Sequence, residues 1–143
     1  MAQKFQWGTT SLKRMKGVDP SIVKVLFRAI RIMSRKKDGV DLTIPWMGGI
    51  RKADEQNNLF MAKFSKCDGY EDKSEHQTGN AIDVIPYIKG GNFYNLDESE
   101  QDLLFYKVAS VMLEASSIEG VPMVWGGNWK TWRDRPHYQK RKY

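Results

Sequence analysis

Both histidines of the 143-residue chain lie in short segments that also contain an acid. His76 and Asp83 belong to the stretch Ser74–Asp83, and Asp134 and His137 lie near the C-terminus. Two imidazoles and one carboxylate form the protein ligand set of a catalytic zinc site, which keeps its fourth position for water. A further acid beside that water can act as its general base. These residue types predict a small zinc hydrolase.

The predicted ligands are far apart in the sequence. His76 and Asp83 lie seven positions apart, which is too far for neighbouring helical turns. They meet only if the chain between them doubles back, and Gly79 supplies a permissive backbone for that. His137 would then close the site from the far end of the chain. For Asp83 the alternatives are a salt bridge or an edge-strand carboxylate that faces water.

Asp134 is the candidate general base. It lies three residues before His137, and residues three apart on a regular strand point to opposite faces. We therefore expect a bend between them, which Pro136 and the restricted conformation of Arg135 would favour. The alternative is that Asp134 forms an ion pair with Arg133 or Arg135.

Three stretches have the apolar spacing of helices that could position these residues. The first is predicted over residues 20–39, the second begins near Asp54, and the third is capped by Asp97 or Ser99 and ended by Gly120. Their predicted apolar faces are, in order, Ile22, Leu26, Ile30 and Met33; Leu59, Phe60 and Phe64; and Leu104, Val108, Val111, Met112 and Ala115.

Short strands are predicted between the helices, at Val40–Ile44, Ala81–Pro86 and Val121–Trp125. In the second strand we expect Ala81, Asp83 and Ile85 on one face. A carboxylate among so many apolar residues is costly to bury unless something such as a cation offsets its charge. Helices interleaved with short strands predict one α+β domain over residues 1–143.

Composition limits the class of protein. Hydrophobic residues make up 41% of the chain, which suits a packed domain, and no apolar run reaches membrane-spanning length. The only cysteine is Cys67, so no internal disulfide forms. We expect it to be a partly buried thiol rather than a metal ligand or a nucleophile. The net charge of +6 implies attraction to a polyanion: nucleic acid, an anionic membrane or an anionic wall polymer.

Four segments carry a resemblance to a known family. Ser74–Asp83 matches S-x-H-x-x-G-x-A-x-D, the signature of zinc D-alanyl-D-alanine carboxypeptidases, which share their fold with the Hedgehog signalling domain. Trp125–Lys130 and Asp134–Gln139 resemble the W-G-G-D-W and D-R-P-H-F-Q motifs of phage L-alanyl-D-glutamate endopeptidase endolysins. Gly49–Gln56 is similar to that branch's G-x-R…E-E-Q segment. The departures are an asparagine at position 128 and a tyrosine at position 138.

The resemblance implies a Hedgehog-like α+β fold, with helices packed around a small antiparallel sheet. It implies Zn²⁺ held by His76, Asp83 and His137, with Asp134 as the general base. It also places Arg51 and Ser74 near the substrate's carboxylate or the developing oxyanion, where an arginine offers a two-pronged donor. Without the resemblance, Arg51 would be interpreted as a surface residue at a helix start.

The implied function is a phage-type endolysin that cuts an amide bond in the peptidoglycan stem peptide. The alternatives are a zinc D,D-carboxypeptidase and a non-catalytic zinc-binding module, whereas no motif supports a nucleic-acid binder. We expect a monomer without a transmembrane segment or a separate cell-wall-binding domain. The N-terminal residues lack the apolar stretch of a signal peptide. We therefore expect the protein to wait in the host cytoplasm and reach the wall after a separate protein opens the membrane.

Three tryptophans near the second histidine have open roles. Trp125, Trp129 and Trp132 are expected mainly in the core. An aromatic platform for sugar or peptide is the alternative for one of them.

Overall fold

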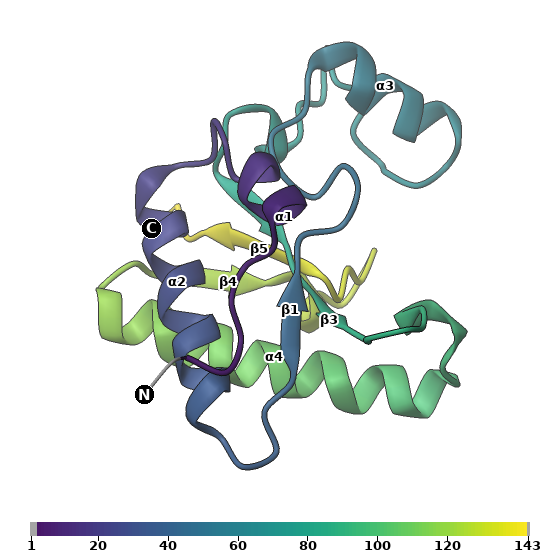
Figure 1. Cartoon of the computed structure of the whole chain (residues 1–143). Coiled ribbons are helices and arrows are strands. Elements are labelled where there is room, and N and C mark those ends of the chain that lie inside the picture. The colour runs from purple at the N-terminus through teal and green to yellow at the C-terminus, as the bar shows by residue number, and fades with distance from the viewer. Residues whose placement is uncertain (1–2, 143) are drawn as a thin grey trace.

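The computed structural model describes residues 3–142, so that residues 1–2 and 143 of the predicted domain lie outside the described part. Its helices and strands interleave along the chain, as the sequence predicted (Figure 1). The helices are α1 (Thr9–Arg14), α2 (Pro20–Arg35), α3 (Ala53–Met61) and α4 (Glu98–Glu119), with 3-10 turns η1 (Glu75–Gln77), η2 (Phe93–Asn95) and η3 (Gly126–Asn128). The strands are β1 (Asp41–Thr43), β2 (Ala81–Asp83), β3 (Ile85–Tyr87), β4 (Met123–Trp125) and β5 (His137–Lys140).

Helices α2 and α4 begin at the caps that the sequence predicted. The Asp19 carboxylate accepts a hydrogen bond from the backbone N–H of Ser21 at 2.8 Å, and Asp97 accepts one from Glu100 at 2.8 Å. Such caps satisfy backbone donors that have no partner inside the helix. Helix α4 ends at Gly120 in the left-handed region. Helix α2 ends at Arg35, earlier than predicted, because the backbone of the next residue is extended.

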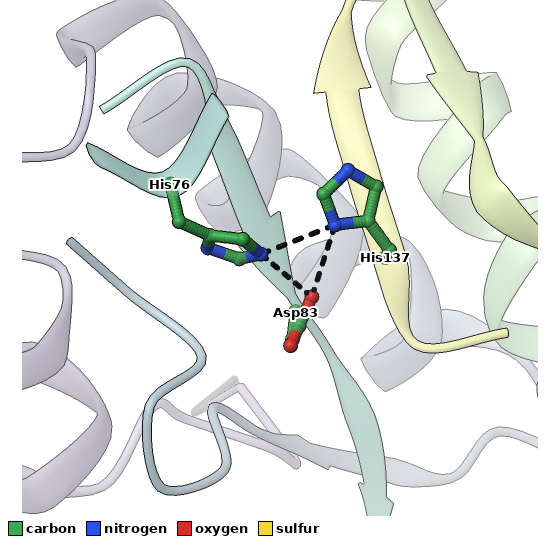
Figure 2. Close-up of side chains that lie close together, drawn as sticks. All are labelled: His76, Asp83 and His137. Carbon is green, nitrogen blue, oxygen red and sulfur yellow. Dashed lines mark hydrogen bonds and ion pairs between the residues drawn. The ribbon is translucent and has the colours of Figure 1, made fainter. Parts of the chain in front are cut away.

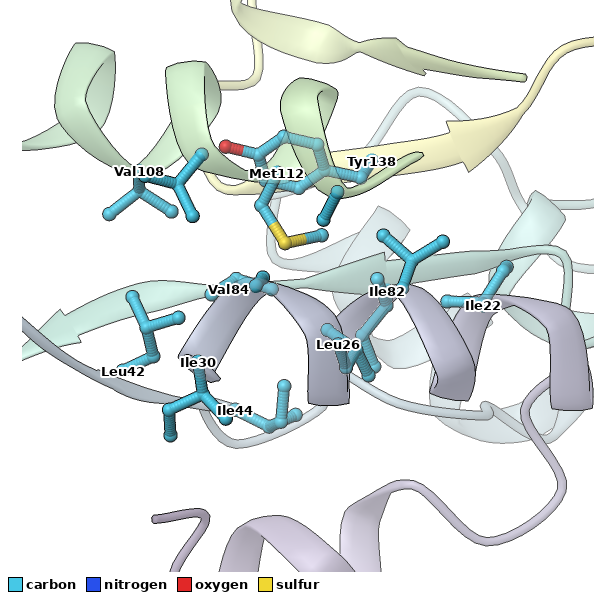
Figure 3. Close-up of a cluster of buried hydrophobic side chains, with 14 of the residues drawn as sticks. Ile22, Leu26, Ile30, Leu42, Ile44, Ile82, Val84, Val108, Met112 and Tyr138 are labelled. Carbon is cyan, nitrogen blue, oxygen red and sulfur yellow. The ribbon is translucent and has the colours of Figure 1, made fainter. Parts of the chain in front are cut away.

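The core lies between these two helices and the strands. Figure 3 shows side chains of α2 facing those of β2 and its continuation, with α4 residues and Tyr138 on the other side. The predicted apolar faces of both helices are buried, except that Leu104 is only partly covered. Because Tyr138 follows His137 directly, the core fixes the strand that carries the second histidine.

The strands form two small antiparallel sheets, one with the order β2-β5-β4 and one that pairs β1 with β3. The predicted strand Ala81–Pro86 is in fact two strands in different sheets, divided at Val84, whose N–H donates to the carbonyl of Pro136. Ile82 and Val84 belong to the hydrophobic core whereas Asp83 faces the two histidines, so these three side chains alternate as expected, although both faces are buried. Asp83 pairs in register with His137. The sheet therefore aligns two of the predicted ligands.

Helix α3 projects from the rest of the molecule (Figure 1). The prediction for its apolar side is wrong. The helix ends at Met61, before Phe64, and both Phe60 and Phe64 are exposed. Its one buried residue is Gln56. Apolar periodicity alone does not distinguish a core face from an exposed one. Helix α1 was not predicted, because six residues are too few to show a period.

Candidate metal centre

Three side chains from separate elements point at one another (Figure 2). His76 Nε2 lies 3.1 Å from His137 Nδ1 and 3.2 Å from Asp83 Oδ1, and His137 Nδ1 lies 3.4 Å from the same oxygen. His76 comes from η1, Asp83 from the end of β2 and His137 from the start of β5. All three residues are buried. The structure thus brings together the three residues that the sequence singled out, and the group could hold a metal ion.

The outer nitrogen of each imidazole has a hydrogen-bond acceptor. His76 Nδ1 lies 2.9 Å from the carbonyl oxygen of Gly49, and His137 Nε2 lies 2.8 Å from Oε1 of Gln139. When these nitrogens donate, the inner nitrogens of the neutral rings carry lone pairs. Such outer contacts are typical of histidines that bind a metal.

The centre has the electrostatics and the dimensions of a cation site. Burial alone would raise the pKa of Asp83, but the two imidazoles hold it below its usual range, so this carboxylate is charged. Its Oδ1 is buried without a hydrogen-bond donor among the described residues. A tetrahedral zinc ion with bonds of about 2.0–2.1 Å places its ligands about 3.3–3.4 Å apart. The three observed separations fit that edge length.

Arg51 is a partly buried residue whose guanidinium faces this centre. Its Nε donates to the carbonyl of Met47 at 2.7 Å and its Nη1 to Oε1 of Gln56 at 3.0 Å. Its Nη2 lies 3.4 Å from Oδ2 of Asp83. The alternative of a surface arginine is therefore wrong, because the side chain is only 12% exposed. Arg51 contacts the oxygen of Asp83 that faces away from the imidazoles.

Asp134 lies beside the centre at the start of a tight turn. The N–H of His137 donates to the carbonyl of Asp134, which gives the bend expected around Pro136. Its Oδ2 is 3.9 Å from His137 Nδ1. Desolvation and the negative charge of Asp83 raise the pKa of Asp134, which makes it a better proton acceptor than an ordinary carboxylate.

The alternative interpretation of Asp134, an ion pair with a neighbouring arginine, finds no support among the described residues. Arg135 pairs instead with Asp102, and Arg133 donates to the carbonyl of Gly127. The carboxylate of Asp134 is 39% exposed and lines the cleft above the centre. It is therefore accessible to a substrate.

Ser74 caps the short turn that carries His76. Its Oγ accepts a hydrogen bond from the N–H of His76 at 3.2 Å, and its own N–H donates to Gln77 at 2.8 Å. The residue also lines the cleft. The observed contacts of Ser74 thus orient His76, and its predicted role towards substrate remains a prediction.

The chain is similar to known peptidases. The model of a family described as phage L-alanyl-D-glutamate peptidase matches residues 3–143. The L-alanyl-D-glutamate peptidase of Escherichia phage T5 is 32% identical over 127 residues, which cover 87% of this chain and 82% of the relative. The chain belongs to the phage L-alanyl-D-glutamate peptidase family. The resemblance found in the sequence is confirmed, and the protein is a peptidase.

The fold is also similar to that of a solved endopeptidase structure. The crystal structure of Serratia marcescens L-Ala D-Glu endopeptidase ChiX matches with a TM-score of 0.71 and 26% identity, over 95% of this chain and 90% of that one. The expected small α+β fold is confirmed. Within the described residues, no helix is long and apolar enough to cross a membrane.

The centre opens into a cleft of about 1080 Å³. Cys67 lines the wall of this cleft, but it is not one of the converging ligands. Its partial burial raises the pKa of the thiol. Trp125 is buried, as expected, and its Nε1 donates to the carbonyl of Arg135. Trp129 and Trp132 line the cleft instead.

Two glycines allow the chain to reach this geometry. Gly79 has a φ of +79°, as expected for a reversal between His76 and β2. A Cβ at Gly126 would lie 2.4 Å from the carbonyl oxygen of Asp134 and 3.1 Å from the Cβ of His137. The peptidase therefore needs the smallest residue where β4 leads into the segment that carries its second histidine.

Sequence reasoning gave no role to two amides of the site. Gln139 accepts from His137, and the fully buried Gln56 accepts from Arg51 while donating to Ser65 and to the carbonyl of Cys67. Both glutamines lie inside the motifs shared with the peptidase family. Their place in these motifs could have indicated a role in the site. Residue type alone does not show which amides support it.

Proposed function

We propose that this peptidase hydrolyses the L-alanyl-D-glutamate bond of the peptidoglycan stem peptide, with a zinc ion held by His76, Asp83 and His137. The observation that carries the proposal is the convergence of two imidazole nitrogens and Asp83 Oδ1, which lie 3.1, 3.2 and 3.4 Å from one another. Nitrogen and carboxylate ligands suit zinc. The names of the family and of the relatives support the choice of bond.

In this proposal Asp134 moves the proton. A zinc ion bound here would supply a water acidified towards neutrality and would polarise the scissile carbonyl. Asp134 Oδ2 accepts the proton of the attacking water and passes it to the leaving amine, which its raised pKa favours. Arg51 and Ser74, which line the same cleft, bind the substrate's carboxylate or the developing oxyanion.

The proposal extends to how the enzyme reaches its substrate. We propose that the enzyme acts as a monomer, because a single chain supplies the three proposed ligands, the base and the substrate-binding groups. The net charge of +6 favours binding to an anionic wall. We propose that the protein acts on the wall from the host cytoplasm after a separate protein has permeabilised the membrane.

Digestion of isolated cell walls tests the function. The purified protein is incubated with peptidoglycan before and after removal of metal by a chelator, and the fragments are weighed by mass spectrometry. We expect stem peptides that begin with D-glutamate, L-alanine left on the glycan, no activity after chelation and recovery with zinc. Loss of a single terminal alanine would instead identify a D,D-carboxypeptidase. Bound zinc without any cleavage would identify a binding module.

A further inference from the structure

A second hollow adjoins the cleft of the metal centre. This hollow measures about 550 Å³ and is lined by Phe60, Met61 and Lys63 together with three residues of the main cleft. The shared residues are Ser65, Lys66 and Trp132. Because these residues line both spaces, the cleft and the hollow adjoin, and we refer to the two together as the trough. Sites for drug-sized ligands occupy roughly 300–1000 Å³, so this trough exceeds what a dipeptide needs.

Trp132 stands at the junction of the two spaces and differs from the buried Trp125. It is 50% exposed, and among the described residues its ring forms no stacking contact and its Nε1 no hydrogen bond. Its φ is +52°, a conformation that is an outlier for a bulky residue and costs on the order of 1–3 kcal/mol. Core packing does not account for this tryptophan, since half of its surface faces solvent.

The chemistry of the proposed substrate places a sugar close to the scissile bond. A stem peptide joins its glycan through a lactyl group followed by L-alanine, so the L-alanyl-D-glutamate bond lies about two residue lengths from the sugar. An extended residue spans at most about 3.6 Å. A cleft that holds this bond must therefore also accommodate the sugar, within roughly 7 Å along the chain.

We propose that Trp132 is a sugar-binding platform that holds the glycan end of the substrate in the trough. This inference rests on the proposed function and adds a binding subsite to it. The carbon-bound hydrogens on one face of a sugar ring pack on the indole, while the sugar hydroxyls remain hydrated. Lys66, which lines both spaces, supplies an ammonium donor for sugar oxygens.

Two substrates and two variants separate this role from a general effect on catalysis. The substrates are a free stem peptide and the same peptide joined to its disaccharide. Trp132→Asn removes the ring and places a residue that tolerates positive φ at this position. Phe27→Ala is the matched control, because Phe27 is 43% exposed on α2, which contributes no residue to the cleft.

We expect Trp132→Asn to lower kcat/KM about tenfold on the glycan-linked substrate. A tenfold change corresponds to the free energy of one aromatic contact. The loss should arise mainly from KM, and cleavage of the free peptide should change less than about twofold. Phe27→Ala should match the wild type on both substrates. Equal losses on the two substrates would overturn the proposal.

A binding measurement gives a readout that does not depend on cleavage. The probe is the peptide-free disaccharide of N-acetylglucosamine and N-acetylmuramic acid, titrated calorimetrically into the wild type and Trp132→Asn. We expect binding that the substitution abolishes; no wild-type binding at millimolar saccharide, or unchanged binding in the variant, would overturn the platform. Trp132-dependent binding without cleavage of either substrate would refute the proposed function and leave the platform standing.

Discussion

Asp83 contacts different partners through its two carboxylate oxygens. Oδ1 faces the two imidazoles, and Oδ2 lies 3.4 Å from Arg51. A single carboxylate therefore connects the proposed metal to the residue proposed to bind the substrate's anion. Its charge is needed on both sides, because an amide oxygen is a weaker ligand and a weaker ion-pair partner.

Removing that charge is expected to release the metal. We predict that Asp83→Asn lowers bound zinc well below one ion per chain and lowers the melting temperature, because metal binding is coupled to folding. Zinc is measured by elemental analysis after dialysis, and stability by thermal unfolding. His76→Ala serves as the companion variant and should behave in the same way. Full zinc occupancy in both variants would show that the ligands are misassigned.

Asp134 should be separable from metal binding, because it lies beside the centre rather than within it. We predict that Asp134→Asn keeps zinc and the wild-type melting temperature but loses roughly 10²- to 10⁴-fold in kcat, the usual contribution of a general base. The side chain is 39% exposed, so an isosteric amide fits there without repacking. Turnover on a synthetic stem peptide is the measurement, and near-normal turnover would remove Asp134 from the mechanism.

At the residue scale the motifs predicted which side chains meet but not how they are held. The spacing of His76, Asp83 and His137 matched a family pattern, and those side chains do converge. Arg51 was recognised only through the resemblance, because an arginine at a helix start is usually exposed. The support from Gln56 and Gln139 depends on distances in the folded chain, which residue type does not encode.

At the scale of the elements, the site depends on a close approach between the turn that follows β4 and the segment that leads into β5. Gly126 lies so near to Asp134 and His137 that a Cβ has no space without a backbone shift. We predict that Gly126→Ala lowers kcat/KM by about 10²-fold or more, since a displacement near 1 Å costs that much at a catalytic site. The melting temperature should fall as well.

Gly8→Ala is the matched control for this prediction. A Cβ at Gly8 meets nothing within 4 Å, and its φ of −70° suits any residue. Activity on the synthetic peptide and thermal unfolding should both match the wild type. Wild-type activity in Gly126→Ala would show that the turn adjusts without moving the site.

Predictions at this scale were right where local chemistry decides the outcome. Asp19 and Asp97 cap the helices they precede because a side-chain oxygen binds nearby N–H groups. The strand predicted at Ala81–Pro86 was wrong in extent, because its two halves pair with β5 and β1, which lie far away in the sequence. Phe64 was wrongly assigned to the apolar side of the second helix, which ends at Met61, and it is exposed, since nothing local reveals what covers an apolar residue.

At the scale of the whole molecule, the hydrophobic core of the described residues contains one buried side-chain hydroxyl without a partner. Tyr138 is fully buried between α4 and the sheet, and its hydroxyl has no hydrogen bond among the described residues (Figure 3). Desolvation raises the pKa of this phenol, so it stays neutral. We predict that Tyr138→Phe stabilises the fold by about 1 kcal/mol, because an unsatisfied buried hydroxyl is removed. Chemical denaturation measures the change, and Tyr87→Phe, at an exposed tyrosine, should have no effect.

The distribution of charge separates binding to the wall from catalysis. The exposed side of α2 carries Lys24, Arg31 and Arg35, and no residue of α2 lines the cleft. Between about 0.01 M and 0.15 M salt the Debye length falls from roughly 30 Å to roughly 8 Å, which screens such a surface from an anionic wall. We predict that wall binding, measured by sedimentation with peptidoglycan, weakens several-fold over this range. Turnover of a short neutral peptide should change little.

A charge reversal on α2 tests whether this face is responsible. Lys24→Glu combined with Arg31→Glu changes the net charge by four units from +6, giving +2, and leaves the buried side of the helix intact. We expect weaker wall binding at low salt, a smaller salt dependence and normal turnover of the short peptide. If the variant binds walls as the wild type does, attraction does not arise at α2. If peptide turnover itself falls with salt in both proteins, then screening acts inside the cleft, where Asp83, Asp134 and Arg51 interact, rather than on the outer surface.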